Sequence, residues 1–330
     1  MISNTLLSKV ARLYYIENRN QQDIAKRLNM SMAGVSRALT RARDCGIVEI
    51  RVHDRTENDL ASEALLESEY RLRESAVVVA SESDDSKSVA MARALADILT
   101  RRLRDGSVLG VSWGETLRAM ADYLPTVNAV KADVVPIIGA MGTIETGVYP
   151  NAIATGFARK LNGKAYLVNA PAIVSSREIC ESMKQDRIFR PVALNWDSVD
   201  TAVVSVSGVT PSDSISRLQI FSVDELEQLR AQGVAGATNF DFLDSDGFQI
   251  QTEIDQRILK IGFERLRNIQ NLVVVAFGAH KVIPLRAVLR SGIVDVLITD
   301  QVTAQALLAP SHRRNAEAEF PETTNQSSGA

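Results

Sequence analysis

The first fifty residues carry apolar positions at helical spacing. Residues 5–17, 21–28 and 31–45 each show a stripe of apolar side chains that recurs every three or four positions. The pair 29–30 separates the second and third stripes as a tight turn, and residues 47–52 alternate apolar and charged side chains as a short strand does. Two short helices joined by a tight turn and followed by a strand are typical of a winged helix-turn-helix, whose second helix enters the major groove of DNA.

Beyond residue 75 the pattern changes to short apolar runs separated by helical stripes. Continuous Val, Ile and Leu runs are typical of strands buried on both faces, and the intervening helices are typical of parallel crossovers. We therefore predict an α/β fold class: an N-terminal all-α winged helix-turn-helix domain, then a larger three-layer α/β effector domain with a mainly parallel sheet. The predicted strands cover residues 76–80, 107–112, 133–139, 164–170, 200–208, 272–278 and 295–300.

An amphipathic, highly charged stretch joins the two regions at residues 57–72. Two interpretations are open: a linker helix that pairs with its copy in a dimer, or a helix that packs on its own body. The polar segment at the C-terminus lacks the apolar residues that a packed core needs, so we expect disorder there. The expected domains are a DNA-binding head (1–56), a linker helix (57–74), an effector domain (75–309) and a disordered tail (310–330).

Charge is distributed unevenly along the chain. The 330 residues are 45% hydrophobic and carry a net charge of only -3, which fits a globular protein of two domains. Residues 1–55 hold 10 Lys and Arg against 5 Asp and Glu, whereas the remainder holds 27 against 35. A basic head on an acidic body suits a polyanionic partner for the head alone.

The remaining bulk features indicate a cytoplasmic protein. The two cysteines form neither a disulfide framework nor a metal cluster. The N-terminal residues lack the apolar segment and cleavage site of a signal peptide, and no run of about 18 apolar residues predicts a transmembrane helix. The three histidines are far apart in sequence, so we expect no metal site, and without a Walker A or G-x-G-x-x-G motif we expect no bound cofactor.

The third helical stripe is the candidate recognition helix, with an ordinary solvated helix as the alternative. Val35 and Leu39 are spaced to pack inward, and Ser31 is placed to cap the helix N-terminus. Arg37 can donate two hydrogen bonds to guanine, whereas later arginines suit phosphates. The predicted DNA-binding residues are Gln21, Ser31, Met32, Ala33, Ser36, Arg37, Arg41 and Arg43.

The segment 110–116, Gly-Val-Ser-Trp-Gly-Glu-Thr, lies where a predicted strand gives way to a helix. Its G-x-S-x-G spacing matches the nucleophile elbow of α/β-hydrolases, and Asp244 and His280 follow in the order of a triad. A purely structural turn is a second interpretation. The third is an anion cradle, formed by backbone N–H groups at the helix N-terminus with the hydroxyls of Ser112 and Thr116. The DNA-binding head favours the cradle over catalysis.

Other polar or glycine positions follow apolar runs and could line the same crevice, or could be ordinary turns. Lys281 could meet an anion at the carboxyl edge of the sheet, where open α/β folds bind ligands. We predict no catalytic residue. The predicted effector-binding residues are Ser112, Trp113, Gly114, Glu115, Thr116, Gly139, Gly142, Asp244 and Lys281.

Five segments in this order resemble the SorC family of bacterial transcriptional regulators, over roughly residues 6–309. They are QQDIAKRLNMSMAGVSRALTRARDCGIVEI (21–50), GVSWGETL (110–117), NAPAIVSS (169–176), FLDSDG (242–247) and FGAHKVIPLRAVLRSGIVDVLITDQVTAQALL (277–308). The resemblance implies a winged helix-turn-helix joined to a domain shaped like sugar-phosphate isomerases, and a homodimer or homotetramer. It also implies operator DNA as the partner and an effector that is a phosphorylated sugar or related metabolite, with its phosphate at Ser112 to Thr116 and Lys281 nearby.

Three positions depart from the family pattern. Glu115 stands in the loop after Trp-Gly, Ala279 replaces a glycine beside Lys281, and Ala237 replaces an Asp. A non-phosphorylated sugar or polyol therefore stays open as the effector. We predict a DNA-binding regulator of a carbohydrate-catabolism operon, with two alternatives: a hydrolase that uses Ser112, or a sugar-phosphate isomerase with a fused head and Asp244 as its base.

Overall fold

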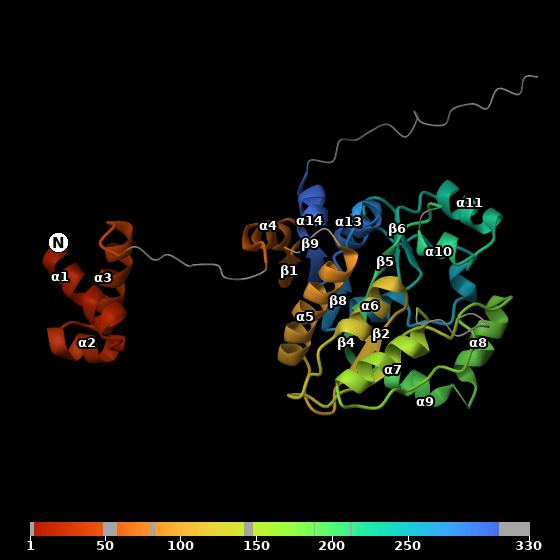
Figure 1. The fold of residues 1–330 in the computed structure, drawn as a ribbon, viewed down its shortest axis with the longest axis horizontal. Coiled ribbons are helices and arrows are strands. Elements are labelled where there is room, and N and C mark those ends of the chain that lie inside the picture. Colours follow the sequence, from red (N-terminus) through yellow and green to blue (C-terminus); the bar gives the residue numbers. More distant parts are fainter. Residues whose placement is uncertain are drawn as a thin grey trace, which may run out of the picture. The chain divides into compact units, whose positions relative to one another are not determined.

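The fold is taken from a computed structural model that describes residues 3–48, 58–79, 83–141, 148–187, 189–211 and 213–309. The chain divides into two compact units, the head Met1–Thr56 and the body Glu57–Ala330 (Figure 1). Each unit has its own core, because the buried apolar side chains of the head form a cluster separate from those of the body.

The head is a small helical unit. It contains α1 (Asn4–Ala11), a π-helical turn (Arg12–Ile16), α2 (Gln21–Leu28) and α3 (Met32–Asp44). Asn29, in the left-handed region at φ 49°, makes the turn between α2 and α3. Ile47 and Val48 pack against the head core but lie in a bend, and the rest of the strand predicted at 47–52 lies outside the described residues.

The body is built on a six-stranded parallel sheet with the strand order β1-β9-β8-β4-β2-β3. All five strand pairs are parallel, which confirms the predicted α/β class. Val runs form these strands because neighbouring residues face opposite helix layers and both faces are buried. The strands are β1 (Glu74–Val78), β2 (Val108–Val111), β3 (Asp133–Pro136), β4 (Val199–Val204), β8 (Asn271–Val275) and β9 (Val296–Asp300).

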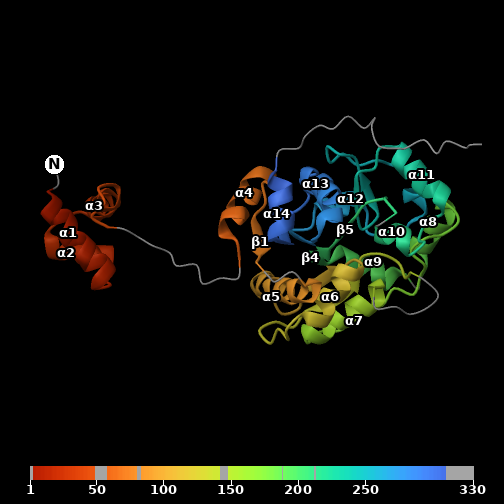
Figure 2. The ribbon, with the colours of Figure 1, turned by 45° about the horizontal axis from the view of Figure 1, so that its top comes forward.

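Helices cover both faces of the sheet, as Figure 2 shows. One face packs on α5 (Asp84–Arg102), α6 (Glu115–Tyr123) and α7 (Pro150–Lys160). The other face packs on α4 (Leu60–Tyr70), α8 (Arg177–Gln185), α9 (Arg190–Asp197), α12 (Phe263–Arg267), α13 (Val282–Arg290) and α14 (Gln301–Leu308).

A second, smaller sheet was not predicted. It is antiparallel, with the order β5-β6-β7. Together with two helices it forms a lobe with its own apolar cluster, which we call the small lobe. Its elements are β5 (Val206–Ser207), α10 (Ser214–Arg217), α11 (Val223–Ala231), β6 (Gly236–Thr238) and β7 (Asp241–Leu243).

The strand predicted at residues 164–170 is wrong. Only Ala165 forms an isolated parallel bridge, to Val134 of the edge strand β3. Val134 N donates to Lys164 O and Tyr166 N donates to Val134 O, both at 2.8 Å, and then the chain diverges. Tyr166 and Leu167 are exposed, so this apolar run is not buried on both faces as a strand of the sheet would be.

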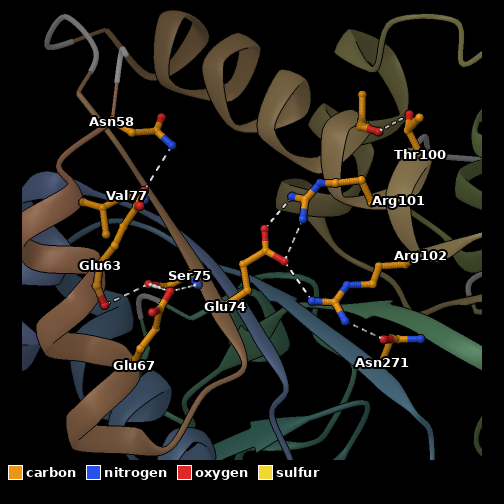
Figure 3. A network of polar contacts seen from close by, with 11 residues as sticks. Asn58, Glu63, Glu67, Glu74, Ser75, Val77, Thr100, Arg101, Arg102 and Asn271 are labelled. Atoms are coloured by element: carbon orange, nitrogen blue, oxygen red, sulfur yellow. Dashed lines mark hydrogen bonds and ion pairs between the residues drawn. The ribbon is translucent and has the colours of Figure 1, made fainter. Parts of the chain in front are cut away.

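The helix α4 packs on its own body. Its Leu66 is fully buried in the main core, and its Asp59 cap is joined to strand β1 by a hydrogen bond from Asp59 N to Val77 O of 2.8 Å. Two glutamates of α4 accept hydrogen bonds from backbone N–H groups of β1: Val77 N lies 2.8 Å from Glu63 Oε1 and Ser75 N lies 2.7 Å from Glu67 Oε1 (Figure 3). Burial raises the pKa of Glu63.

Candidate functional site

The exposed face of α3 is the candidate DNA interface. Val35 and Leu39 are buried in the head core, as their spacing predicted. Ser31 caps the helix, because its Oγ accepts a hydrogen bond from Gly34 N at 3.0 Å. Gln21 lies half-buried at the start of α2. The other predicted DNA-binding residues are exposed, and they are Met32, Ala33, Ser36, Arg37, Arg41 and Arg43.

The body holds a cleft of about 360 Å³ at the carboxyl ends of three adjacent strands, β2, β4 and β8. This is the edge at which open α/β sheets bind ligands. The N-terminal turn of α5 and the small lobe complete its walls. Of the predicted effector-binding residues, the cleft brings together Ser112, Trp113, Gly114, Glu115, Thr116 and Lys281.

A tight hairpin of the small lobe contributes to the cleft. It joins β6 to β7 through Asn239 and Phe240, both with positive φ, 51° and 59°. Positive φ is unusual for Phe, and a surrounding structure must hold it. Phe240 stacks on Trp113 with ring centroids 4.9 Å apart, and Asn239 Oδ1 accepts a hydrogen bond from Ser112 Oγ at 2.8 Å. The loop after β2 therefore fixes the hairpin.

Ser112 is not arranged as a hydrolase nucleophile. Its hydroxyl is almost fully buried and donates to Asn239. Asp244, the third member of the predicted triad, accepts hydrogen bonds at Oδ1 from Asp246 N and Phe248 N, both at 2.9 Å. The geometry therefore does not assemble the Ser-Asp-His arrangement that the sequence spacing allowed.

The N-terminus of α6 opens into the cleft. Gly114 precedes it at φ 116°, a conformation that favours glycine, and the described residues provide no side-chain cap for the helix. The next residue, Glu115, turns its carboxylate to the small lobe, where Oε2 lies 2.5 Å from Nη2 of Arg217 on α10. Both side chains are about half exposed.

Two titratable groups of the cleft follow strand β8. Lys281 is buried, and its Nζ donates to Val206 O at 2.9 Å. Burial lowers the pKa of Lys281, and the nearby carboxylate of Asp213 opposes this shift. Burial also lowers the pKa of His280, with the Lys281 charge as the second cause. Both effects disfavour the charged imidazolium of His280.

A buried charge cluster supports the hairpin from behind. Lys260 Nζ donates to Phe240 O at 2.6 Å, and it lies 2.6 Å from the carboxylates of both Asp241 and Asp255. Burial raises the pKa of Asp241 to about 6, against the opposing effect of Lys260. The cluster fixes the backbone at Phe240, because a buried ammonium needs all of these partners.

Two predicted effector-binding residues, Asp244 and Gly139, do not line the cleft. Asp244 is held by its own turn, as described above. Gly139 lies in a backbone crossing, since its N–H donates to Leu259 O at 2.8 Å and a Cβ there would lie 2.6 Å from Ala172 Cα. This close approach explains the glycine without a ligand. Gly142 lies outside the described residues.

Several lining residues were missed by the sequence interpretation. They come from helix starts, loops and hairpins of widely separated segments, and they bear no common motif. Among them are Asp84, Ser88, Ser205, Ser207, Ser214, Asn239 and Phe240. Across the described parts of the chain, His, Cys, Asp and Glu side chains form no group suited to a metal ion, and no helix is long and apolar enough to cross a membrane.

A helix-turn-helix head joined to an α/β body with a ligand-sized cleft defines a ligand-binding transcriptional regulator. Residues 54–309 match the family described as "Putative sugar-binding domain". The chain belongs to the SorC family of sugar-binding transcriptional regulators.

Curated relatives and a solved structure align over almost the whole chain. The sorbitol operon regulator of Klebsiella pneumoniae is 29% identical over 307 residues, which are 92% of this chain and 97% of the relative. The deoxyribonucleoside regulator of Bacillus subtilis is 29% identical over 302 residues, 91% of this chain and 96% of the relative. The crystal structure of the full-length sorbitol operon regulator SorC from Klebsiella pneumoniae superposes with a TM-score of 0.70 at 29% identity, covering 92% and 98% of the two chains. These matches favour a carbohydrate operon regulator over the hydrolase and isomerase alternatives.

Proposed function

We propose that this protein regulates a carbohydrate-catabolism operon in the cytoplasm by binding operator DNA with its head and a sugar or polyol, free or as a phosphate ester, in the cleft of its body. One observation carries the proposal: the loop 112–116 and Lys281 meet at the carboxyl edge of the sheet, among hydroxyl and aromatic side chains. Relatives named as regulators of sorbitol and deoxyribonucleoside genes support a carbohydrate effector.

The proposed assembly is a homodimer or homotetramer. Two heads read two half-sites whose spacing mirrors the protein symmetry. The effector changes DNA affinity only by its differential affinity for two arrangements of the body. Thermal-shift screening of sugars, polyols and their phosphates, followed by DNA binding with each hit, tests the proposal. A compound that the protein converts chemically, instead of only binding it, would favour the isomerase alternative.

Arg37 is the proposed base-reading residue. Replacing it with alanine is expected to weaken specific DNA binding by ~1–3 kcal/mol, because two hydrogen bonds to a base are lost. The probe is a duplex selected by the wild-type protein from a random-sequence pool, and binding is measured by fluorescence anisotropy. Arg12→Ala, an exposed arginine outside α3, serves as the matched control. Equal affinity of the Arg37→Ala and wild-type proteins would remove Arg37 from base reading.

A chain of polar contacts runs from the cleft to the start of α4. Asp84 and Ser88 line the cleft from the N-terminal turn of α5, and Lys87 between them pairs with Asp300 at 3.3 Å. The next residue, Gln301, donates from Nε2 to Asp59 Oδ2 at 3.0 Å. Asp59 caps α4, which directly follows the segment joining the head to the body.

Gln301→Ala is expected to reduce the effect of the effector on DNA binding without changing effector affinity. Wild-type coupling of about 5–150-fold would be typical of such regulators, and the variant should approach a factor of one. The measurement is DNA affinity with and without a screening hit, next to the Kd of the hit alone. Gln305→Ala, an exposed residue of the same helix, is the control. Wild-type coupling in the Gln301 variant would exclude this route.

A further inference from the structure

We propose that Glu115 selects the charge of the effector: its carboxylate, held by Arg217, supplies the negative charge at the N-terminus of α6. The cleft then takes an uncharged sugar or polyol in preference to its phosphate ester. The inference rests on the proposed function, namely that the cleft is the effector site.

The first support is the position of the Glu115 carboxylate. Glu115 is the first residue of the nine-residue helix α6, whose N-terminus faces the cleft. A helix N-terminus carries a positive partial charge and stabilises a nearby anion. Glu115 adds a carboxylate to this first turn, and its Oε2 lies 2.5 Å from Arg217 Nη2. An incoming phosphate would meet this negative charge close to the helix N-terminus and would have to compete with it for Arg217.

The second support is the charge of the cleft wall. Two carboxylates, Asp84 and Glu115, line it, and among the described lining residues Lys281 is the only Lys or Arg. The Lys281 ammonium is already bonded to Val206 O, and burial lowers the pKa of the neighbouring His280, which disfavours its charged form. A phosphate dianion would therefore enter a wall with more negative than positive side chains, which opposes its binding.

The third support is the abundance of neutral polar groups. Hydroxyl and amide side chains can both donate and accept hydrogen bonds, as the hydroxyls of a polyol do. Aromatic rings offer an apolar surface for the carbon skeleton. The neutral polar residues of the wall are Ser88, Ser112, Thr116, Ser205, Ser207, Ser214 and Asn239, and the aromatic residues are Trp113, Phe240 and Phe277.

Arg217 allows the inference to be tested with a single variant and a double variant. In the wild-type protein its guanidinium is paired with Glu115 across two elements of the cleft mouth, α6 and α10. Neutralising Glu115 releases the guanidinium, which can bond phosphate through two parallel N–H groups. Glu115→Gln should therefore convert this end of the cleft into an anion site, and the added Arg217→Ala change should abolish it.

The experiment measures binding of inorganic phosphate, D-sorbitol and D-sorbitol 6-phosphate to the full chain by isothermal titration calorimetry. Glu115→Gln is expected to bind inorganic phosphate about tenfold more tightly than the wild-type protein, because a carboxylate is lost and a charge-assisted bond is gained. Asp122→Asn removes the same charge at the other end of α6, where Asp122 pairs with Arg118, and this variant should bind phosphate as the wild-type protein does.

The outcomes distinguish a failure of the role proposed for Glu115 from a failure of the cleft as the effector site. Equal phosphate affinity in the wild-type and Glu115→Gln proteins, or an equal gain in Asp122→Asn, would overturn the role of Glu115. So would tighter binding of D-sorbitol 6-phosphate than of D-sorbitol by the wild-type protein. Tighter binding of inorganic phosphate by Glu115→Gln, lost again when Arg217→Ala is added, supports the inference. This holds even where neither sorbitol compound binds. The cleft as effector site fails separately, if hits from the carbohydrate screen bind equally well after Trp113→Ala.

Discussion

Replacing Lys260 with methionine is expected to lower the free energy of unfolding of the body by about 3–5 kcal/mol, because one partner of a buried charge cluster is lost. Methionine is similar in length but has no ammonium. Asp241 is fully buried, and in the variant its carboxylate would have no countercharge from Lys260, while Phe240 O would lose its donor. Urea unfolding monitored by circular dichroism measures the change. Lys131→Met, at an exposed lysine, is the matched control.

The same variant should show a characteristic pH dependence. Burial already raises the pKa of Asp241 to about 6, and loss of the opposing ammonium raises this pKa further. A group whose folded pKa lies above its unfolded pKa binds more protons in the folded state, so stability increases as the pH falls through the folded value. The deficit of Lys260→Met relative to wild type should therefore shrink as the pH falls from neutrality towards about 6, because below that value Asp241 of the wild-type protein binds a proton as well. A deficit that is constant with pH would contradict a buried, uncompensated Asp241 carboxylate.

Operator affinity is expected to fall by ~10³–10⁵ between about 50 mM and 200 mM salt, if the proposed dimer makes about six to ten phosphate contacts. The basis is the excess of Lys and Arg over Asp and Glu in the head and the exposure of Arg37, Arg41 and Arg43 on one helix. Counterions released from DNA by these side chains make binding weaker at high salt. Anisotropy titrations at five salt concentrations give the slope. A flat slope would exclude the head as an electrostatic DNA-binding surface.

The large sheet could be predicted because its strands are continuous apolar runs. Leu272 to Val275 are all buried, alternately against the two helix layers. A run of this kind fits few structures other than a strand buried on both faces. The small lobe could not be predicted, since its strands have two or three residues and fall below the length at which periodicity is visible. Its hairpin turn also lacks an Asn-Gly signal, because Phe240 occupies a left-handed position, where its packing on Trp113 and the hydrogen bond from Lys260 to its carbonyl hold it.

The lining of the cleft was predictable where it follows a strand of the large sheet. Ser112 to Thr116 and Lys281 come just after β2 and β8, and carboxyl ends of parallel strands meet at one edge. Arg217 could not be found in this way, because it lies on the four-residue helix α10 and reaches the cleft mouth only through Glu115. Gly139 and Asp244 also follow apolar runs, but a close backbone crossing and a self-bonded turn account for them. A position directly after an apolar run therefore does not by itself distinguish a residue that lines the cleft from one in an ordinary turn or backbone crossing.

The hydrogen bonds between α4 and strand β1 also decide where the body can be separated from the head. β1 is an edge strand, and an edge strand with free backbone N–H groups is a template for another chain. In this protein Glu63 and Glu67 accept from those groups, and Asp59 N pairs with the same strand. In a fragment that begins at Glu74, the edge of β1 would be unprotected, and the fragment is expected to aggregate by strand addition. A fragment that begins before Asn58 keeps α4, which covers this edge.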